Sequence, residues 1–280
     1  MSRYRIVHTT GFRYGGQAVA SYNEARMLPT RDNSQLVFST KLDIQPHGSS
    51  HEYFDYFKTR AVMFEVLEPH SELTITSTSV VELRPTIGVE PGLAWHDLEP
   101  EIRSSLALTD AVTQTRRTNP PAELVRFAKK IAAKQTPHET AMQICRKVFD
   151  EMTYRHGVTG VHSIATEAWS AKIGVCQDYA HITLGALRAV GIPARYVSGY
   201  LHPAKDPKVG EKVVGESHAW VEWWAGSWFA FDPTNYVYAA DRHIVVGRAR
   251  DYDDLAPLRG VFAGAVDSEL FVSVEITKEA

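Results

Sequence analysis

Short runs of hydrophobic and β-branched residues, some of them alternating with polar ones, fill the first third of the chain. The runs lie at residues 4–8, 36–44, 53–57, 61–67 and 73–81. Glycine and proline separate them, as at Gly15-Gly16, Pro29, Pro46 and Pro69. Because this region shows no helical period, we expect several short strands that form an antiparallel sheet or sandwich.

The pattern changes to a helical one after about residue 85. Pro85, Gly88 and the Glu90-Pro91-Gly92 turn predict a connecting segment. The sequence therefore predicts an α+β protein in three parts: a β-domain over residues 1–85, a connecting segment over 86–118 and a second domain over 119–280.

A capping box marks the start of one helix in the second part. In Thr136-Pro137-His138-Glu139 the threonine and glutamate side chains can each cap the other's backbone N–H, and the proline suits the first helical position. The helix that follows places five apolar residues on one face: Met142, Cys145, Val148, Phe149 and Met152. We therefore expect Cys145 to be an inert core residue.

Composition and charge narrow the class of protein. Hydrophobic residues make up 44% and charged residues 22% of the 280 residues, which is ordinary for a globular chain. The net charge of −3 gives no basic surface for nucleic acid. No apolar run approaches the ~20 residues of a membrane span, and the first residues lack the pattern of a signal peptide. With two cysteines, too few for a disulfide framework, we expect a cytoplasmic, reduced protein.

The segment Gly174-Val175-Cys176-Gln177-Asp178 begins a predicted helix that ends at Gly191 and Pro193. Cys176 then lies at the helix N-terminus, where unpaired N–H groups and the helix dipole favour a thiolate. The same N–H groups could stabilise an oxyanion. Alternatively, Cys176 is a small core residue. Asp178, in the first turn, is expected to cap the helix.

Residues 216–224 and 227–235 predict a β-hairpin around the Ala225-Gly226 turn. His218 and Asp232 are each seven residues from Ala225, so they should face each other within one or two residues of register. A carboxylate that orients a histidine is half of a catalytic triad, although such pairs also occur as structural contacts. The preceding residues 202–215 read as an exposed loop and a candidate lid.

The remaining histidines, His243 among them, show no spacing typical of a metal site. We expect a structural or surface role for each of them, and a hydrogen bond within the core for His181. No metal or other cofactor is expected.

Taken together, four segments resemble the transglutaminase-like superfamily. They are Gly174-Val175-Cys176-Gln177-Asp178-Tyr179-Ala180, Pro193-Ala194-Arg195-Tyr196-Val197-Ser198-Gly199-Tyr200, Ser217-His218-Ala219-Trp220 and Asp232-Pro233-Thr234. The match covers about residues 140–250, and the Cys…His…Asp order also fits. The flanks, such as Tyr4-Arg5-Ile6-Val7-His8-Thr9-Thr10, are similar to a bacterial branch with its own N-terminal β-domain. One departure is Asp55-Tyr56-Phe57-Lys58-Thr59, where that branch has a Gly-Asn turn.

The resemblance implies an antiparallel β-sandwich-like domain followed by a papain/transglutaminase-like core, in which helices pack on an antiparallel sheet. It implies that Cys176, His218 and Asp232 form a catalytic triad, and it makes Tyr154 and Gln177 candidates for an oxyanion donor or pocket wall.

Members of this branch are described as cysteine proteases or transglutaminase-like enzymes. The function we expect is hydrolysis of an amide or peptide bond in a protein or peptide substrate, through a thioester. The alternatives are a protein-glutamine amine transferase and a non-catalytic binding module of the same fold. The first domain could restrict the cleft, bind a partner or mediate formation of a homo-oligomer.

Overall fold

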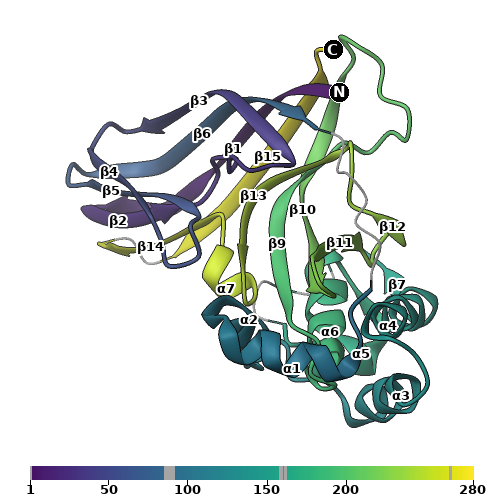
Figure 1. Ribbon diagram of the computed structural model, residues 1–280. Coiled ribbons are helices and arrows are strands. Elements are labelled where there is room, and N and C mark those ends of the chain that lie inside the picture. Colours follow the sequence, from purple (N-terminus) through teal and green to yellow (C-terminus); the bar gives the residue numbers. More distant parts are fainter. Residues whose placement is uncertain (1, 85–91, 158–159, 161–162, 265–266) are drawn as a thin grey trace.

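The structure is a computed structural model that describes residues 2–84, 92–157, 160, 163–264 and 267–280. Two sheets make up one end of the molecule, and the helices gather at the other end, around strands β9 (Ala194–Leu201), β10 (Lys212–Trp224) and β13 (His243–Ala249) (Figure 1). The mixture of antiparallel sheets and helices confirms the predicted α+β class.

The first part of the chain forms a β-sandwich. Strands β1 (Ser2–Ala18), β6 (His70–Leu83) and β3 (Gln35–Gln45) lie side by side in the large sheet. Strands β2 (Ala20–Ala25), β5 (Arg60–Val66) and β4 (Ser49–Phe54) belong to a second, four-stranded sheet. Buried side chains of both sheets, such as Leu73 and Phe64, form one hydrophobic cluster between them.

Strand β2 is the one strand of this part that the hydrophobic pattern did not predict. Its buried positions are Ser21, Asn23 and Ala25, two of which are polar. The Asn23 amide donates to the Ser21 hydroxyl over 3.1 Å, so both polar groups are satisfied inside the sandwich. A strand with a polar buried face leaves no hydrophobic alternation to detect.

The predicted strand at residues 53–57 ends early, at Phe54. Asp55 Oδ1 accepts hydrogen bonds from the backbone N–H groups of Phe57 (3.0 Å) and Thr59 (2.9 Å). Lys58 takes a left-handed conformation, with φ of 66°. The Asp55 side chain therefore closes the β4–β5 turn at the position where the family resemblance led us to expect Gly-Asn.

The large sheet joins the two halves of the chain. Its order is β12-β11-β10-β15-β1-β6-β3, where β11 is Trp228–Asp232 and β12 is Val237–Tyr238, and β9 pairs with both β10 and β13. Strand β10 (Lys212–Trp224) pairs with β15 (Ser268–Lys278) over residues 212–215 and with β9 (Ala194–Leu201) over residues 216–223. One continuous strand thus belongs to both halves.

The last two strands lie with the first half of the chain. Strand β15 runs antiparallel to β1, and β14 (Leu258–Ala263) runs antiparallel to β2. The predicted division places both strands in the second domain, whereas the structure uses them to complete the two sheets of the first. The reason is that β1 and β2 each have a free edge that no neighbour in sequence fills.

The helices surround one buried helix. The predicted connecting segment contains α1 (Trp95–Ser104) and α2 (Leu106–Val112), and Pro85, Gly88 and residues 90–91 of its predicted turn lie outside the described residues. Then follow α3 (Ala122–Ala132), α4 (Pro137–Glu151), α5 (Ala165–Ala171), α6 (Cys176–Arg188) and α7 (Tyr252–Leu255). None of the described helices is long and apolar enough to cross a membrane. Every residue of α6 after Cys176 is buried, so this helix is the centre of the second half.

The predicted start of α4 is confirmed. Glu139 Oε2 accepts from the Thr136 backbone N–H (2.9 Å), and Thr136 Oγ1 accepts from the Glu139 N–H (3.3 Å). Cys145 is fully buried as expected, whereas Phe149 is 37% exposed and lies beside the ring of Tyr236. The buried face of α4 is therefore narrower than the predicted one.

Residues 202–215 are only in part the predicted exposed loop. His202 is buried, and residues 212–215 belong to β10. The intervening loop is held to the C-terminal strand, since Gly210 N–H donates to the Lys278 carbonyl (2.9 Å) and Lys278 Nζ donates to the Pro207 carbonyl (3.3 Å). These contacts hold the loop against β15 rather than leaving it free to act as a lid.

Candidate active site

Cys176 is the first residue of α6, as predicted, and its side chain is partly exposed. The short strand β8 (Ile173–Gly174) leads into the helix. Asp178 Oδ2 accepts from the Val175 backbone N–H (2.8 Å), and Asp178 Oδ1 accepts from the Ser163 hydroxyl (2.5 Å). Asp178 therefore caps the helix, as expected, and orders the turn that carries the cysteine.

The hairpin that carries His218 and Asp232 forms as predicted, with its centre one residue later. Val221 pairs with Phe231 and Trp224 with Trp228 across β10 and β11 (Trp228–Asp232). This register centres on Gly226, whose φ of 89° suits glycine. In this register His218 lies two residues away from the position directly opposite Asp232, which is within the predicted range.

The two side chains meet inside the protein. His218 Nε2 lies 2.8 Å from Asp232 Oδ2, and the exposed fractions of the two residues are 9% and 0%. Asp232 Oδ1 also accepts from the backbone N–H groups of Thr234 (2.9 Å) and Asn235 (3.2 Å), and Asp232 Oδ2 accepts from Asn235 Nδ2 (2.7 Å). The carboxylate is therefore held from several sides.

Electrostatics make this pair an imidazolium and a carboxylate at neutral pH. Burial disfavours the charged form of His218, but the Asp232 carboxylate and the neighbouring Cys176 side chain outweigh it and raise the pKa of His218 to about 10. Burial likewise opposes the charge on Asp232, but His218 and the hydrogen bonds from both histidines hold the pKa of that carboxyl well below its usual range. The structure thus brings Cys176, His218 and Asp232 together.

Tyr154 lies on the strand beside the cysteine. Strand β7 (Thr153–Tyr154) runs parallel to β8, with Tyr154 in register with Gly174, two residues before Cys176. The Tyr154 side chain is 37% exposed, and its ring centroid is 6.4 Å from that of Tyr179, one turn into α6. Gln177 is buried in the first turn of the same helix. Both predicted pocket residues thus lie near the start of α6.

His243 also contacts the site, although the sequence predicted only a structural or surface role for it. It begins β13 (His243–Ala249), which pairs with β9 through His243 and Leu201. Its Nε2 lies 3.3 Å from Asp232 Oδ2, and its Nδ1 accepts from the Ala240 backbone N–H (3.4 Å). No spacing in the sequence signals this contact, because the pairing of β13 with β9 creates it.

Among the described residues, His218, Asp232 and His243 also form a group whose ligand atoms lie within 4.8 Å of one another, close enough to hold a metal ion. A metal would need an unprotonated nitrogen from each histidine. In the structure the Nε2 atoms of both histidines face Asp232 Oδ2, and the Ala240 N–H occupies His243 Nδ1. This arrangement fits a hydrogen-bonded network around a carboxylate.

His181 has the core role that its position in the helix predicted. It is fully buried, and its Nε2 accepts from the Tyr252 backbone N–H (3.2 Å). Burial, with help from Arg117 and Arg188, lowers the pKa of His181 to about 3. It is therefore a neutral acceptor that holds α7 against α6.

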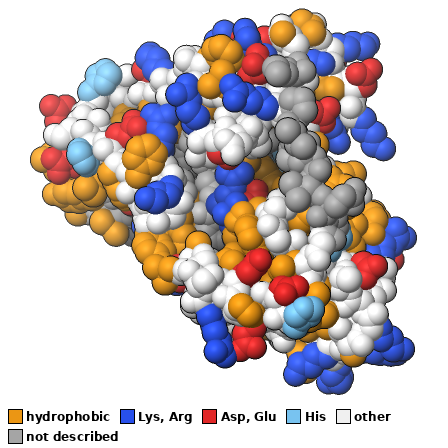
Figure 2. Space-filling view, viewed as in Figure 1, with side chains coloured by type: hydrophobic (Ala, Val, Ile, Leu, Met, Phe, Trp, Pro, Cys, Tyr) orange, Lys and Arg blue, Asp and Glu red, His pale blue; other side chains and the backbone are white. Residues whose placement is uncertain are grey.

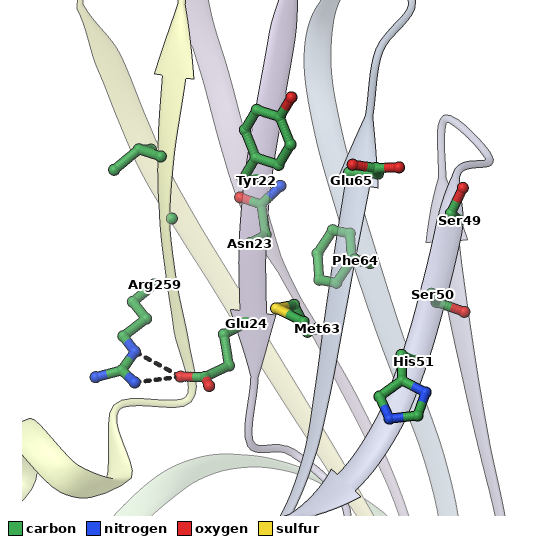
Figure 3. A pocket seen from close by; sticks show the side chains of 12 residues that line it. Tyr22, Asn23, Glu24, Ser49, Ser50, His51, Met63, Phe64, Glu65 and Arg259 are labelled. Atoms are coloured by element: carbon green, nitrogen blue, oxygen red, sulfur yellow. Dashed lines mark hydrogen bonds and ion pairs between the residues drawn. The ribbon is translucent and has the colours of Figure 1, made fainter.

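A separate groove of about 720 Å³ lies across the four-stranded sheet, over β14, β2, β5 and β4 (Figure 3). Tyr22, Met63 and Val261 line it and are more than half exposed, and Arg259 pairs with Glu24 at one end. In the space-filling view, hydrophobic side chains gather at this end of the molecule (Figure 2). None of its lining residues belongs to the triad.

Two family models match the chain. Residues 125–233 match the transglutaminase-like superfamily, and residues 4–82 match the bacterial transglutaminase-like N-terminal region. The crystal structure of a candidate cysteine protease from Cytophaga hutchinsonii has the same fold, with a TM-score of 0.74 at 18% identity, over 99% of this chain and 97% of that one.

Three relatives share sequence with the chain. An uncharacterized protein of Mycobacterium leprae is 41% identical over 287 residues and covers 100% of both chains. One from Mycobacterium tuberculosis is 34% identical, over 98% of this chain and 92% of its own. A protein-glutamine gamma-glutamyltransferase of Pseudomonas aeruginosa is 35% identical over 94 residues, which are 32% of this chain and 14% of that protein. The chain thus belongs to the transglutaminase-like superfamily, in the branch that carries the bacterial transglutaminase-like N-terminal region.

Proposed function

We propose that the protein is a cysteine-dependent hydrolase of amide or peptide bonds, with Cys176 as nucleophile, His218 as general acid and base, and Asp232 as the residue that orients His218. The observation that carries this proposal is the buried His218–Asp232 contact of 2.8 Å beside a cysteine at a helix N-terminus. In such a pair, His218 keeps a proton for the leaving group while Cys176 acts as the thiolate nucleophile.

The reaction then proceeds in two halves. The Cys176 thiolate attacks the substrate carbonyl carbon, and the oxyanion that forms is met by N–H groups at the start of α6, which have no partner within the helix. His218 gives its proton to the leaving amine as the C–N bond breaks, which leaves a thioester on Cys176. His218 next takes a proton from water, and the resulting hydroxide attacks the thioester carbonyl. The C–S bond then breaks, which releases the acid product and regenerates the Cys176 thiolate beside the His218 imidazolium.

Tyr154 and Gln177 are the side chains we propose near the oxyanion. Tyr154 lies in register with Gly174, and Gln177 is in the first turn of α6. Replacement of Tyr154 by Phe removes one hydroxyl. If that hydroxyl binds the oxyanion, turnover should fall about tenfold or more while substrate binding stays the same.

The second candidate activity is transfer of the acyl group to an amine. The observation in its favour is the sequence similarity of 94 residues to the Pseudomonas aeruginosa transferase. Both activities pass through the same thioester on Cys176, and they differ in whether water or an amine attacks it. Partial exposure of Cys176 is compatible with either acceptor.

A thiol-alkylating probe tests the nucleophile without knowledge of the substrate. We expect iodoacetamide to label Cys176 selectively, because Cys145 is fully buried and burial raises the pKa of its thiol. His218→Ala should abolish the fast labelling. Equal labelling of both cysteines, or none at Cys176, would contradict the proposal.

A substrate screen then separates the activities. Wild type and Cys176→Ala are incubated with a peptide library, with and without an isotopically labelled amine, and the products are read by mass spectrometry. New carboxyl ends that need Cys176 support hydrolysis, whereas incorporation of the amine supports transfer. If Cys176 reacts with iodoacetamide but neither product forms, the result favours a binding module.

A further inference from the structure

The β-domain holds the backbone on both sides of His243. On one side, the Tyr4 hydroxyl on β1 donates to the Asp241 carbonyl (3.0 Å). On the other side, the Gln35 side chain on β3 pairs with Val245: Gln35 Oε1 accepts from the Val245 N–H (2.8 Å), and Gln35 Nε2 donates to the Val245 carbonyl (2.7 Å). Tyr4 and Gln35 are almost fully buried. Residues of the first half of the chain therefore help to hold segment 241–245, which also pairs with β9.

The two ring nitrogens of His243 have different partners. The Ala240 N–H donates to Nδ1, so the ring proton of a neutral His243 is on Nε2 and points to Asp232 Oδ2. Burial lowers the pKa of His243, which keeps the ring neutral. The Trp220 indole packs against this ring in a T-shaped arrangement, with 5.1 Å between ring centroids, and it also stacks on the His218 ring with 6.2 Å between centroids. His243 is thus a fixed, neutral donor to the carboxylate.

We propose that His243 is a positioning residue for Asp232, and that the N-terminal β-domain serves the active site by holding His243 in place. This inference rests on the proposed function, in which Asp232 orients His218. It assigns the first half of the chain a role in building the active site.

The hydrogen bonds to Asp232 explain why His243 affects the orientation of His218. Asp232 Oδ2 is the oxygen that contacts His218, and it also accepts from His243 and Asn235. Asn235 is exposed, so water competes for its contact, whereas His243 is buried. Loss of the His243 donor lets the carboxylate turn about its own bond and loosens the orientation of the His218 ring.

Three variants and one matched control test the proposal. His243→Ala removes the donor, and His243→Gln keeps an N–H at a similar reach. Tyr4→Phe removes only the hydroxyl that holds the Asp241 carbonyl. Tyr14→Phe is the control, because Tyr14 is also a buried tyrosine of β1 but packs in the cluster between the two sheets.

The first readout is the rate of Cys176 alkylation by iodoacetamide at pH 6. A tenfold loss corresponds to about 1.4 kcal/mol, close to the lower end of what a hydrogen bond to a charged group contributes. We expect about a tenfold loss for His243→Ala and about threefold for Tyr4→Phe. His243→Gln should stay within about threefold of wild type, and Tyr14→Phe should not change.

The second readout is the NMR spectrum of protein with ¹⁵N-labelled histidine, which does not depend on reactivity. The spectrum should place the proton of neutral His243 on Nε2, and the His218 N–H signal should move in His243→Ala and Tyr4→Phe but not in Tyr14→Phe. An Nδ1–H tautomer, or an unchanged His218 signal in His243→Ala, would overturn the inference.

The two readouts separate the proposals. If Cys176 of the wild type fails to react, the proposed function is lost and the NMR result alone decides the role of His243. If Cys176 reacts and His243→Ala reacts equally fast, the function stands and the positioning role falls. Should His243→Ala fail to fold, Tyr4→Phe and His243→Gln still give both readouts.

Discussion

His218 and Asp232 lie two residues out of direct register across one hairpin, and their side chains still meet at 2.8 Å. Diagonal neighbours on the same face of an antiparallel pair are within reach of long side chains. The two residues are 14 positions apart in the sequence, so the oriented histidine needs little of the rest of the fold. By contrast, Cys176 lies on α6 and His243 on β13, outside the hairpin, and the N-terminal strands are separate elements as well.

Asp232→Asn should suppress the reactivity of Cys176. The variant keeps the shape of the side chain and an oxygen for the N–H groups of Thr234 and Asn235. Without the carboxylate charge, burial lowers the pKa of His218, and the thiolate loses its cationic partner. We expect iodoacetamide alkylation at pH 6 to slow about 100-fold. Asp241→Asn, an exposed acid in the next turn, should react like wild type.

The stability of the protein should depend on pH through His218. Its pKa is about 10 in the folded protein and ~6.5 in an unfolded chain, so the folded state binds this proton more tightly. The stabilisation is therefore fully present below about pH 6.5 and is lost as the pH rises toward 10. Its size is on the order of 3 kcal/mol.

Urea unfolding of wild type and His218→Gln at pH 6, 8 and 10 measures this effect. The difference in free energy of unfolding between the two proteins should shrink as the pH rises. A difference that is the same at all three values would show that His218 binds its proton equally in both states.

Gly174→Ala should disturb the start of α6. A Cβ at this position would lie 2.7 Å from the Asp178 Cβ and 2.8 Å from its Oδ2, the oxygen that caps Val175. We expect a loss of about 2 kcal/mol in the free energy of unfolding together with slower alkylation of Cys176. Gly16→Ala is the control, because a Cβ there meets nothing within 4 Å. Equal stability of the two variants would argue against the cap.

Gln35→Ala should destabilise the whole protein. The substitution leaves the buried N–H of Val245 without its partner and removes one of the donors to the Val245 carbonyl. Because one buried backbone N–H is left unpaired, we expect the free energy of unfolding to fall by about 1–3 kcal/mol. Chemical denaturation measures it. Gln17→Ala, at an exposed position of β1, should change stability by less than about 0.5 kcal/mol.

Local features of the site could be read from the sequence. The capping box at Thr136 and the start of α6 at Cys176 depend on residues within one helical turn, and the hairpin depends on one turn and two short strands. Hydrogen bonds over such short separations are decided by neighbouring residues, so residue type and spacing predict them. The family resemblance, which the comparisons confirm, rests on these same segments.

The buried polar strand β2 and the pairing of the last two strands could not be predicted from local sequence. Strand β2 buries Ser21 and Asn23, so no hydrophobic pattern marks it, and β14 and β15 pair with strands more than 200 residues away in sequence. Which free edge a strand fills is set by the whole arrangement of sheets.

The sequence by itself determined the fold class, the helix that presents Cys176 and the hairpin that pairs His218 with Asp232. Only the tertiary structure decided that His243 joins Asp232 and that Tyr4 and Gln35 hold it there. The Gln35–Val245 contact spans 210 residues, and its partners carry no mark in their own segments. Contacts of this kind form only when the strands that carry them have packed together, because each partner is an ordinary polar residue until burial makes its hydrogen bond necessary.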